Sequence, residues 1–154
     1  MYDALTVARY IINYSNRQGY GVTNLKLQKL LYFVQAAFLK IYGNACFKED
    51  MQAWDMGPVV PGVYHEFKRY GNRNIPTVTE YAGIGYEFSG KKTVYDDSVI
   101  AKDHKEVIEF IVELFKNHDA STLVEITHRQ NAWKNAYVPW KNNILLLEDL
   151  KDVF

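Results

Sequence analysis

Apolar side chains recur every three or four residues near the start of the chain. Between Asp3 and Asn16 they occupy Ala4, Val7, Ala8, Ile11 and Ile12. This spacing places them on one face of a helix, so the pattern predicts a first helix over residues 3–16. Gly19 and Gly21 follow and end it.

A longer apolar stripe predicts a second helix between Thr23 and Gly43. The stripe consists of Leu27, Leu30, Leu31, Val34, Phe38 and Ile41. Thr23 can accept a backbone N–H as N-cap, and Gly43 suits a left-handed residue after the last turn. Lys26, Lys29 and Lys40 fall off the stripe, so we expect them to face water or a partner.

The sequence of the middle of the chain predicts short strands and turns around a third helix. We expect a short strand over 45–48, a turn over 56–58, and a third helix that begins at Pro61 and ends at Gly71. Residues 75–96 are β-branched or alternating. In this stretch Ile84–Phe88 and Lys92–Tyr95 would pair across a Ser89-Gly90 turn as a hairpin that leans on the helices.

Helical spacing returns in the last third. It predicts helices over 98–116, over 120–128 with Asp119 as N-cap, and over 144–154, with a helical turn over 132–136. The fold class expected is therefore mainly α (α+β): a single-domain helical bundle, residues 1–154, with a small β-hairpin insert around 75–96.

Composition narrows the classes of protein that fit. The 154 residues carry 18 basic and 18 acidic side chains, so no net field attracts nucleic acid or membrane. The charge is uneven, because residues 1–43 hold five basic side chains against Asp3, and 96–125 hold eight acids against three lysines. Cys46 is the single cysteine, and no apolar run is long enough for a membrane span, which predicts a cytoplasmic protein.

Catalytic and metal-binding patterns do not emerge from the residue spacing. His65-Glu66 has Arg69 where a zinc helix needs its second His. Cys46 lies beside Phe47 in apolar surroundings, typical of an inert thiol. We therefore expect no catalytic residue, no metal and no cofactor. A recognition helix for DNA would be more basic than the second helix with Lys26 and Lys29, so nucleic acid is not the favoured partner.

Protein binding is the remaining class. Trp54, Met56 and Pro58 cluster in an irregular segment, and Trp is the residue type most often found as an interface anchor. Trp133 with His128 could form a second anchor. From the residues alone, the alternative that both Trp side chains pin loops to the core is equally favoured.

Four motifs in order carry a resemblance to a known family. They are Leu25-Lys26-Leu27-Gln28-Lys29-Leu30-Leu31-Tyr32, Ala53-Trp54 with Gly57-Pro58-Val59, Tyr64-X-X-Phe67-Lys68-X-Tyr70-Gly71, and Leu123-X-X-X-Thr127-His128 with Trp133. Together they resemble the Panacea antitoxin domain family, which includes SocA-like and GepA-like phage-associated proteins, over roughly residues 3–140. Ala132 departs from the family, which often carries Pro before that Trp.

The resemblance implies an antitoxin and not an enzyme. Family members neutralise a cognate protein toxin by direct binding, by occlusion or by delivering it to a protease as an adaptor, and many lie on prophages. As partner-binding residues we expect Lys26, Gln28, Lys29, Trp54, Met56, Pro58, His128 and Trp133. Two alternatives stay open: a small metal-dependent hydrolase or nuclease with a site near His65, His128 and Asp55, and a phage-borne inhibitor of a host protein.

Overall fold

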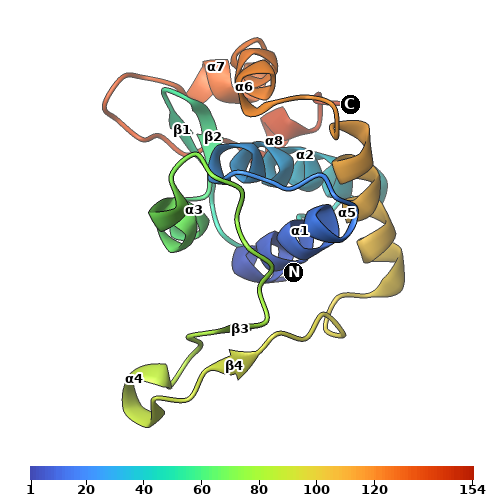
Figure 1. Ribbon diagram of the computed structural model, residues 1–154. Helices are drawn as coiled ribbons and strands as arrows, with labels where there is room; N and C mark the ends of the chain where they lie inside the picture. The colour runs from blue at the N-terminus through green and yellow to red at the C-terminus, as the bar shows by residue number, and fades with distance from the viewer.

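The computed structural model describes residues 1–154 and is mainly helical, with two small antiparallel sheets (Figure 1). The helices are α1 (Ala4–Arg17), α2 (Asn24–Tyr42), α3 (Pro61–Phe67), α4 (Tyr86–Ser89), α5 (Lys102–Leu114), α6 (Ala120–His128), α7 (Asn131–Ala136) and α8 (Leu147–Leu150). A 3₁₀ turn, Lys68–Tyr70, follows α3. The strands are β1 (Gln52–Trp54), β2 (Gly57–Val59), β3 (Glu80–Tyr81) and β4 (Thr93–Val94). The predicted fold class is confirmed.

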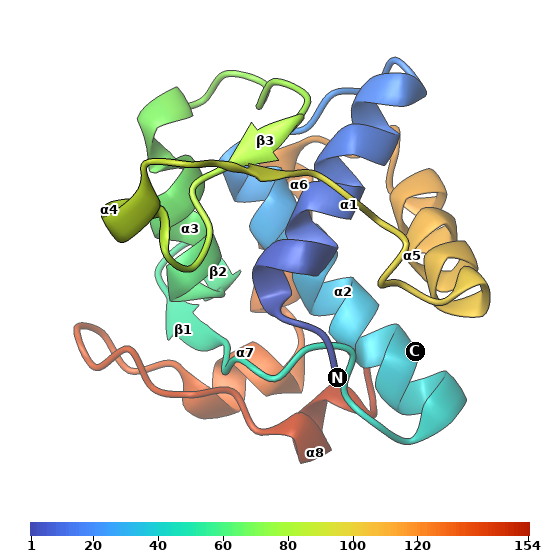
Figure 2. The ribbon, with the colours of Figure 1, turned by 90° about the horizontal axis from the view of Figure 1, so that it is seen from below.

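Helix α2 is the central element of the molecule. It contacts α1, α3, α5, α6, α8 and strand β2, and both ribbon views show it between its neighbours (Figures 1 and 2). Its ends are those that the sequence predicts. Thr23 accepts the Lys26 N–H at 3.3 Å, and Gly43 ends the helix at a φ of 72°. A helix enclosed on nearly every side buries polar side chains together with apolar ones.

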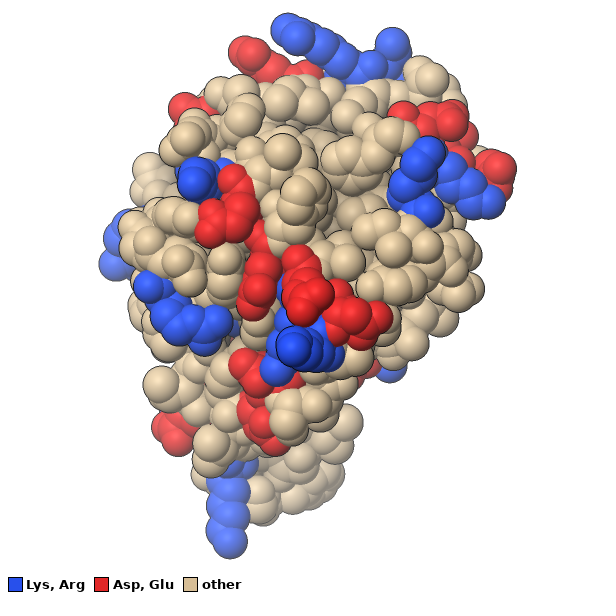
Figure 3. All heavy atoms as spheres, turned by 90° about the vertical axis from the view of Figure 1, so that its right-hand side faces the viewer, with Lys and Arg blue, Asp and Glu red and all other residues tan.

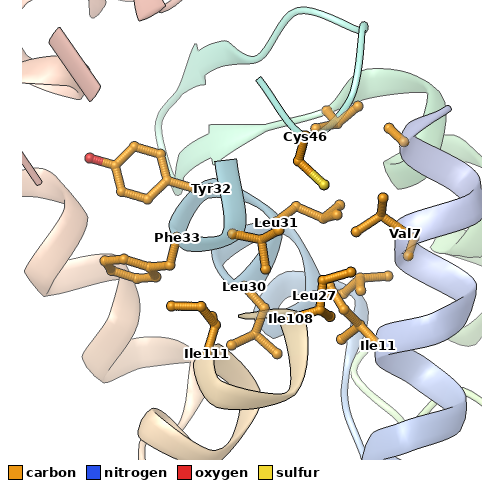
Figure 4. Close-up of a cluster of buried hydrophobic side chains, with 14 of the residues drawn as sticks. Val7, Ile11, Leu27, Leu30, Leu31, Tyr32, Phe33, Cys46, Ile108 and Ile111 are labelled. Atoms are coloured by element: carbon orange, nitrogen blue, oxygen red, sulfur yellow. The ribbon is translucent and has the colours of Figure 1, made fainter. Parts of the chain in front are cut away.

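The core gathers around this helix. Figure 4 shows Val7 and Ile11 of α1 and Ile108 and Ile111 of α5 meeting the leucines of α2. Cys46 lies in the same cluster, and burial raises the pKa of its thiol to about 12. The thiol therefore stays protonated and acts as a small apolar side chain.

Tyrosine hydroxyls join α1 to the acidic helix α5. Tyr10 donates to Glu109 at 2.5 Å, and Tyr14 donates to Glu113 at 3.0 Å. Tyr20, which follows α1, also donates to Glu113, at 2.7 and 2.5 Å. These bonds and the Tyr14 bond lower the pKa of Glu113. Part of the high tyrosine content therefore holds two helices together through polar tips.

The β insert exists, but its predicted first strand over 84–88 and its predicted turn are wrong. Strands β3 and β4 pair across the one-turn helix α4, which lies between the left-handed Gly85 and Gly90. Ile84 and Phe88 are fully exposed, so the alternating pattern has no buried face to pack against. The insert leans on α1 as expected (Figure 2). Asn13 exchanges two hydrogen bonds with the Val78 backbone, and the Arg9 guanidinium lies 3.4 Å from the centre of the Tyr81 ring.

Three other predicted elements differ from the structure. Residues 45–48 form only a bridge between Phe47 and Tyr2. The helix predicted over 98–116 begins at Lys102, because Asp96 instead accepts the Ser98 N–H and O–H. The last helix is limited to α8, because Ile144 pairs with Gln52 of β1 in extended form.

Candidate functional site

The hairpin of β1 and β2 places a two-residue turn at the surface. Trp54 pairs with Gly57, so the turn residues are Asp55 and Met56. The predicted turn over 56–58 is therefore displaced, since Gly57 and Pro58 are buried in β2. Met56 is 51% exposed and Trp54 is half-buried. An exposed thioether beside an indole is an adaptable apolar surface, of the kind that protein interfaces use.

Polar side chains of α2 hold the inner side of this hairpin. Gln28 accepts the Val60 N–H at 2.9 Å, and its amide donates to Asn24 at 2.9 Å. Asn24 in turn donates to the Tyr64 carbonyl of α3 at 3.0 Å. All these groups lie between α2 and the segment from β2 to α3, so Gln28 and Asn24 fix where the hairpin leaves the core.

Lys29 makes the deepest of these contacts. Its side chain is fully buried, and Nζ donates to the Pro58 carbonyl at 2.7 Å. Gly57 makes room for it, because a Cβ at that position would lie 3.0 Å from Lys29 Cε and 2.8 Å from Thr127 Oγ1. Burial lowers the pKa of Lys29 to about 7. The amine is therefore only partly charged at neutral pH.

Lys29, expected to face water or a partner, and Gln28, expected to bind a partner, do not reach the surface. Both are fully buried, because β2, α3 and α6 cover the side of α2 that the sequence pattern leaves polar. Pro58 is buried as well. Lys26 is half-exposed, and its Nζ donates to the Phe115 carbonyl at 2.9 Å, at the end of α5. Three of the eight predicted partner-binding residues are thus parts of the scaffold beneath the hairpin.

Replacing Gln28 by Leu should lower the free energy of unfolding by roughly 2–4 kcal/mol, because the Val60 N–H and the Asn24 side-chain oxygen Oδ1 lose their buried partner. Urea denaturation measures this. Gln18→Leu is the matched control, since Gln18 is exposed and its side chain makes no hydrogen bond. Equal stabilities of the two variants would show that Gln28 does not hold the hairpin.

The Lys29 amine should make the protein more stable as the pH rises from about 7 to about 8.5, the value near which an unfolded Cys46 thiol begins to lose its own proton and opposes the effect. The unfolded chain keeps the Lys29 proton up to an ordinary pKa of 10.5, whereas the folded chain releases it near 7. The unfolded state therefore binds more protons in this range, and raising the pH favours folding by at most about 1.4 kcal/mol per unit. Thermal unfolding across the range tests this, and Lys29→Met should remove the slope. An unchanged slope in that variant would contradict the assignment.

An aromatic stack holds the outer side of the hairpin. The Trp133 ring lies between His128, at 4.1 Å between ring centres, and Tyr137, at 4.3 Å. Trp133 Nε1 donates to the Trp54 carbonyl at 2.8 Å, and His128 Nε2 donates to the Asp55 carbonyl at 2.8 Å. The Tyr137 hydroxyl donates to the Asp55 carboxylate, a bond that raises the pKa of the phenol. The turn is thus fixed by three bonds from α6, α7 and the residue after α7.

Replacing Trp133 by Phe should keep the stack and remove one hydrogen bond, so we expect a loss of about 1–2 kcal/mol of stability from the unpaired Trp54 carbonyl. Trp140→Phe is the control, because Trp140 is 93% exposed. Chemical denaturation of both variants measures the difference. A neutral effect at Trp133 would mean that the indole does not fix the hairpin.

The structure brings the predicted residues together in two roles. Trp54 and Met56 lie at the surface, whereas Trp133 and His128 hydrogen-bond to the backbone of the turn and hold it in place. Sequence reasoning missed Tyr137 as a member of the stack; its position four residues after Trp133, on the same side of a helical turn, is the signal that could have found it.

The residues of the hydrolase alternative have other contacts. His128 contacts the Asp55 backbone, and the Asp55 carboxylate is bound by Tyr137. His65 packs against the rings of Trp54 and Tyr64. The structure contains no group of three or more His, Cys, Asp or Glu side chains placed to hold a metal ion.

None of its helices has the length and apolar character needed to cross a membrane.

Most of the residues that form this site lie in a stretch that matches a known family. The family profile described as "Antitoxin SocA-like, Panacea domain" matches residues 27–134. The chain therefore belongs to the SocA-like antitoxins of the Panacea domain family. Its sequence is 37% identical over 73 residues to Antitoxin SocA of Caulobacter vibrioides (strain NA1000 / CB15N), a match covering 47% of this chain. That match spans 39% of the length of the Caulobacter protein. No solved structure matches the chain significantly.

Proposed function

We propose that this protein is an antitoxin that neutralises a cognate protein toxin by direct protein–protein binding, without a reaction of its own. Family membership supports the antitoxin role, and the Caulobacter relative carries that name. The observation that carries the proposal is the convergence of the family motifs on one hairpin. Gln28, Lys29, His128 and Trp133 come from three separate helices, and each contacts the backbone of residues 54–60.

The arrangement suits a preformed interface. Two exposed or half-exposed apolar side chains, Met56 and Trp54, are held on a hairpin whose backbone is fixed from both sides. A surface that is ordered before binding loses little conformational entropy when the partner arrives. The toxin would bury Met56 and Trp54, and the complex would either occlude the toxin's active surface or present the toxin to a protease. Residues 1–154 would act as one antitoxin domain.

Co-expression with each flanking gene tests the function. We expect one neighbour to arrest growth when expressed alone and to be tolerated when this protein is present. A stable complex that co-purifies would favour occlusion, whereas rescue with loss of the toxin and no stable complex would favour delivery to a protease. Absence of any toxic neighbour, with no rescue, would contradict the antitoxin role and favour inhibition of a host protein.

A further inference from the structure

A large groove lies beside the hairpin, with a volume of about 840 Å³. The beginning of α2, the β1–β2 turn, the end of α3 with the residues after it, and the loop between α5 and α6 form its walls. The side chains that matter for its chemistry are Lys26, Trp54, Met56, Tyr64, Lys68 and Lys116. The groove therefore continues the surface that the hairpin displays.

The charge of the groove is positive. Its walls carry Lys26, Lys68 and Lys116 against one carboxylate, Asp119. Asp119 is engaged as the N-cap of α6, where it accepts the Thr122 N–H at 2.8 Å. Lys68 is exposed and forms no ion pair, and Lys116 is 3.9 Å from Glu113. Lys68 is thus free to meet an incoming anion, and Lys116 can exchange its exposed, long contact with Glu113 for one.

The face over α5 has the opposite character. Figure 3 shows acidic side chains gathered along it, with a few basic ones between them. Positive charge at the groove is therefore a local feature of a chain whose net charge is zero. Local charge of this kind selects an orientation and a partner more than it adds affinity.

The groove also has an apolar side. The Trp54 and Tyr64 rings meet edge to face at 5.1 Å between centres, and Val59 and Met56 adjoin them. A ring pair of this kind can accept an aliphatic or aromatic side chain in the same groove that holds the lysines. The combination fits a chain segment that carries both kinds of group.

We propose that this groove binds an acidic, extended segment of the protein partner, with one apolar side chain on Trp54 and Tyr64 and carboxylates facing Lys68 and Lys116. The inference rests on the proposed function and names the chemistry of the toxin at the same site. A nucleic acid fits less well, because binding a continuous polyanion depends on many phosphate contacts and α5 presents carboxylates beside the groove.

Selection from a displayed library of random peptides on the immobilised protein tests the groove without knowledge of the toxin. We expect enriched peptides to hold several Asp or Glu residues around one large apolar residue. The double variant Lys68→Glu/Lys116→Glu should weaken a selected peptide by about tenfold or more, as should raising salt from about 50 to about 300 mM. Lys40→Glu/Lys102→Glu, which reverses two exposed lysines outside the groove, should change little.

Four results would overturn the inference. They are no enrichment, enrichment of basic peptides, binding that the Lys68→Glu/Lys116→Glu variant leaves unchanged, and a single-stranded oligonucleotide that binds more tightly and is lost in that variant. Competition separates this inference from the antitoxin role. A toxin that is neutralised but does not displace the selected peptide would overturn the groove assignment alone. Acidic peptides that bind in the groove, without any neutralised toxin, would leave the groove chemistry standing and contradict the antitoxin role.

Discussion

Replacing Gly57 by Ala should destabilise the protein by roughly 3 kcal/mol, because a φ of 98° disfavours any L side chain and the new methyl group overpacks the site. The methyl carbon would lie 2.8 Å from Thr127 Oγ1 and 3.0 Å from Lys29 Cε. Both neighbours are fully buried, so neither can move away easily. Urea denaturation measures the loss, and we expect a displaced hairpin to weaken partner binding as well.

Gly43→Ala is the matched control for this variant. Gly43 also has a positive φ, 72°, but no atom lies within 4 Å of the position that its Cβ would take. Gly43→Ala should lower the free energy of unfolding by only about 1 kcal/mol, because only the positive φ disfavours Ala at this position. If the two variants lose equal stability, close packing of α2 and α6 around Gly57 contributes nothing to the placement of the hairpin.

Replacing Met56 by Asp should weaken binding of the toxin by about 30-fold or more, the effect expected when an anchor worth roughly 2 kcal/mol is lost. The side chain is 51% exposed and makes no hydrogen bond, so folding should be nearly unchanged. Titration calorimetry with the toxin identified by co-expression measures the affinity, and thermal unfolding of the free variant checks the fold.

Val99→Asp provides the comparison. Val99 is 63% exposed and belongs to the segment between β4 and α5. Figure 1 shows this segment away from the β1–β2 hairpin. It places the same charge on an exposed apolar position, so it should leave both the affinity and the rescue of growth unchanged. Equal weakening by both variants would show a general charge effect, and no weakening by Met56→Asp would exclude Met56 as an anchor.

Local signals account for the helices that the sequence predicted well. Thr23 and Asp119 cap α2 and α6 through their own side chains, and Gly43 ends α2, so these boundaries depend on neighbouring residues alone. The fold class follows from such segments. The spacing of apolar residues in α1 and α2 is equally local, which is why these helices differ from prediction by only one residue or so at each end.

The sequence could not predict that polar side chains of α2 are buried at the site, because segments from distant parts of the chain cover them. Lys29 and Gln28 lie off the leucine stripe of α2, and a helical pattern alone assigns such positions to solvent. Their burial depends on β2, α3 and α6, which reach α2 from distant parts of the chain. The hairpin itself has the same origin, because its position depends on Trp133 and His128, more than 70 residues further along the sequence.

Hydrogen exchange of the protein, free and bound to the toxin that co-expression identifies, tests most directly whether the hairpin face is the binding surface. If the hairpin face binds the toxin, exchange should slow in residues 52–60 and in residues 116–121, which include the α5–α6 loop and the start of α6, with little change in the insert over 80–94. Protection confined to the insert or to α5, with the hairpin exchanging as in the free protein, would contradict it.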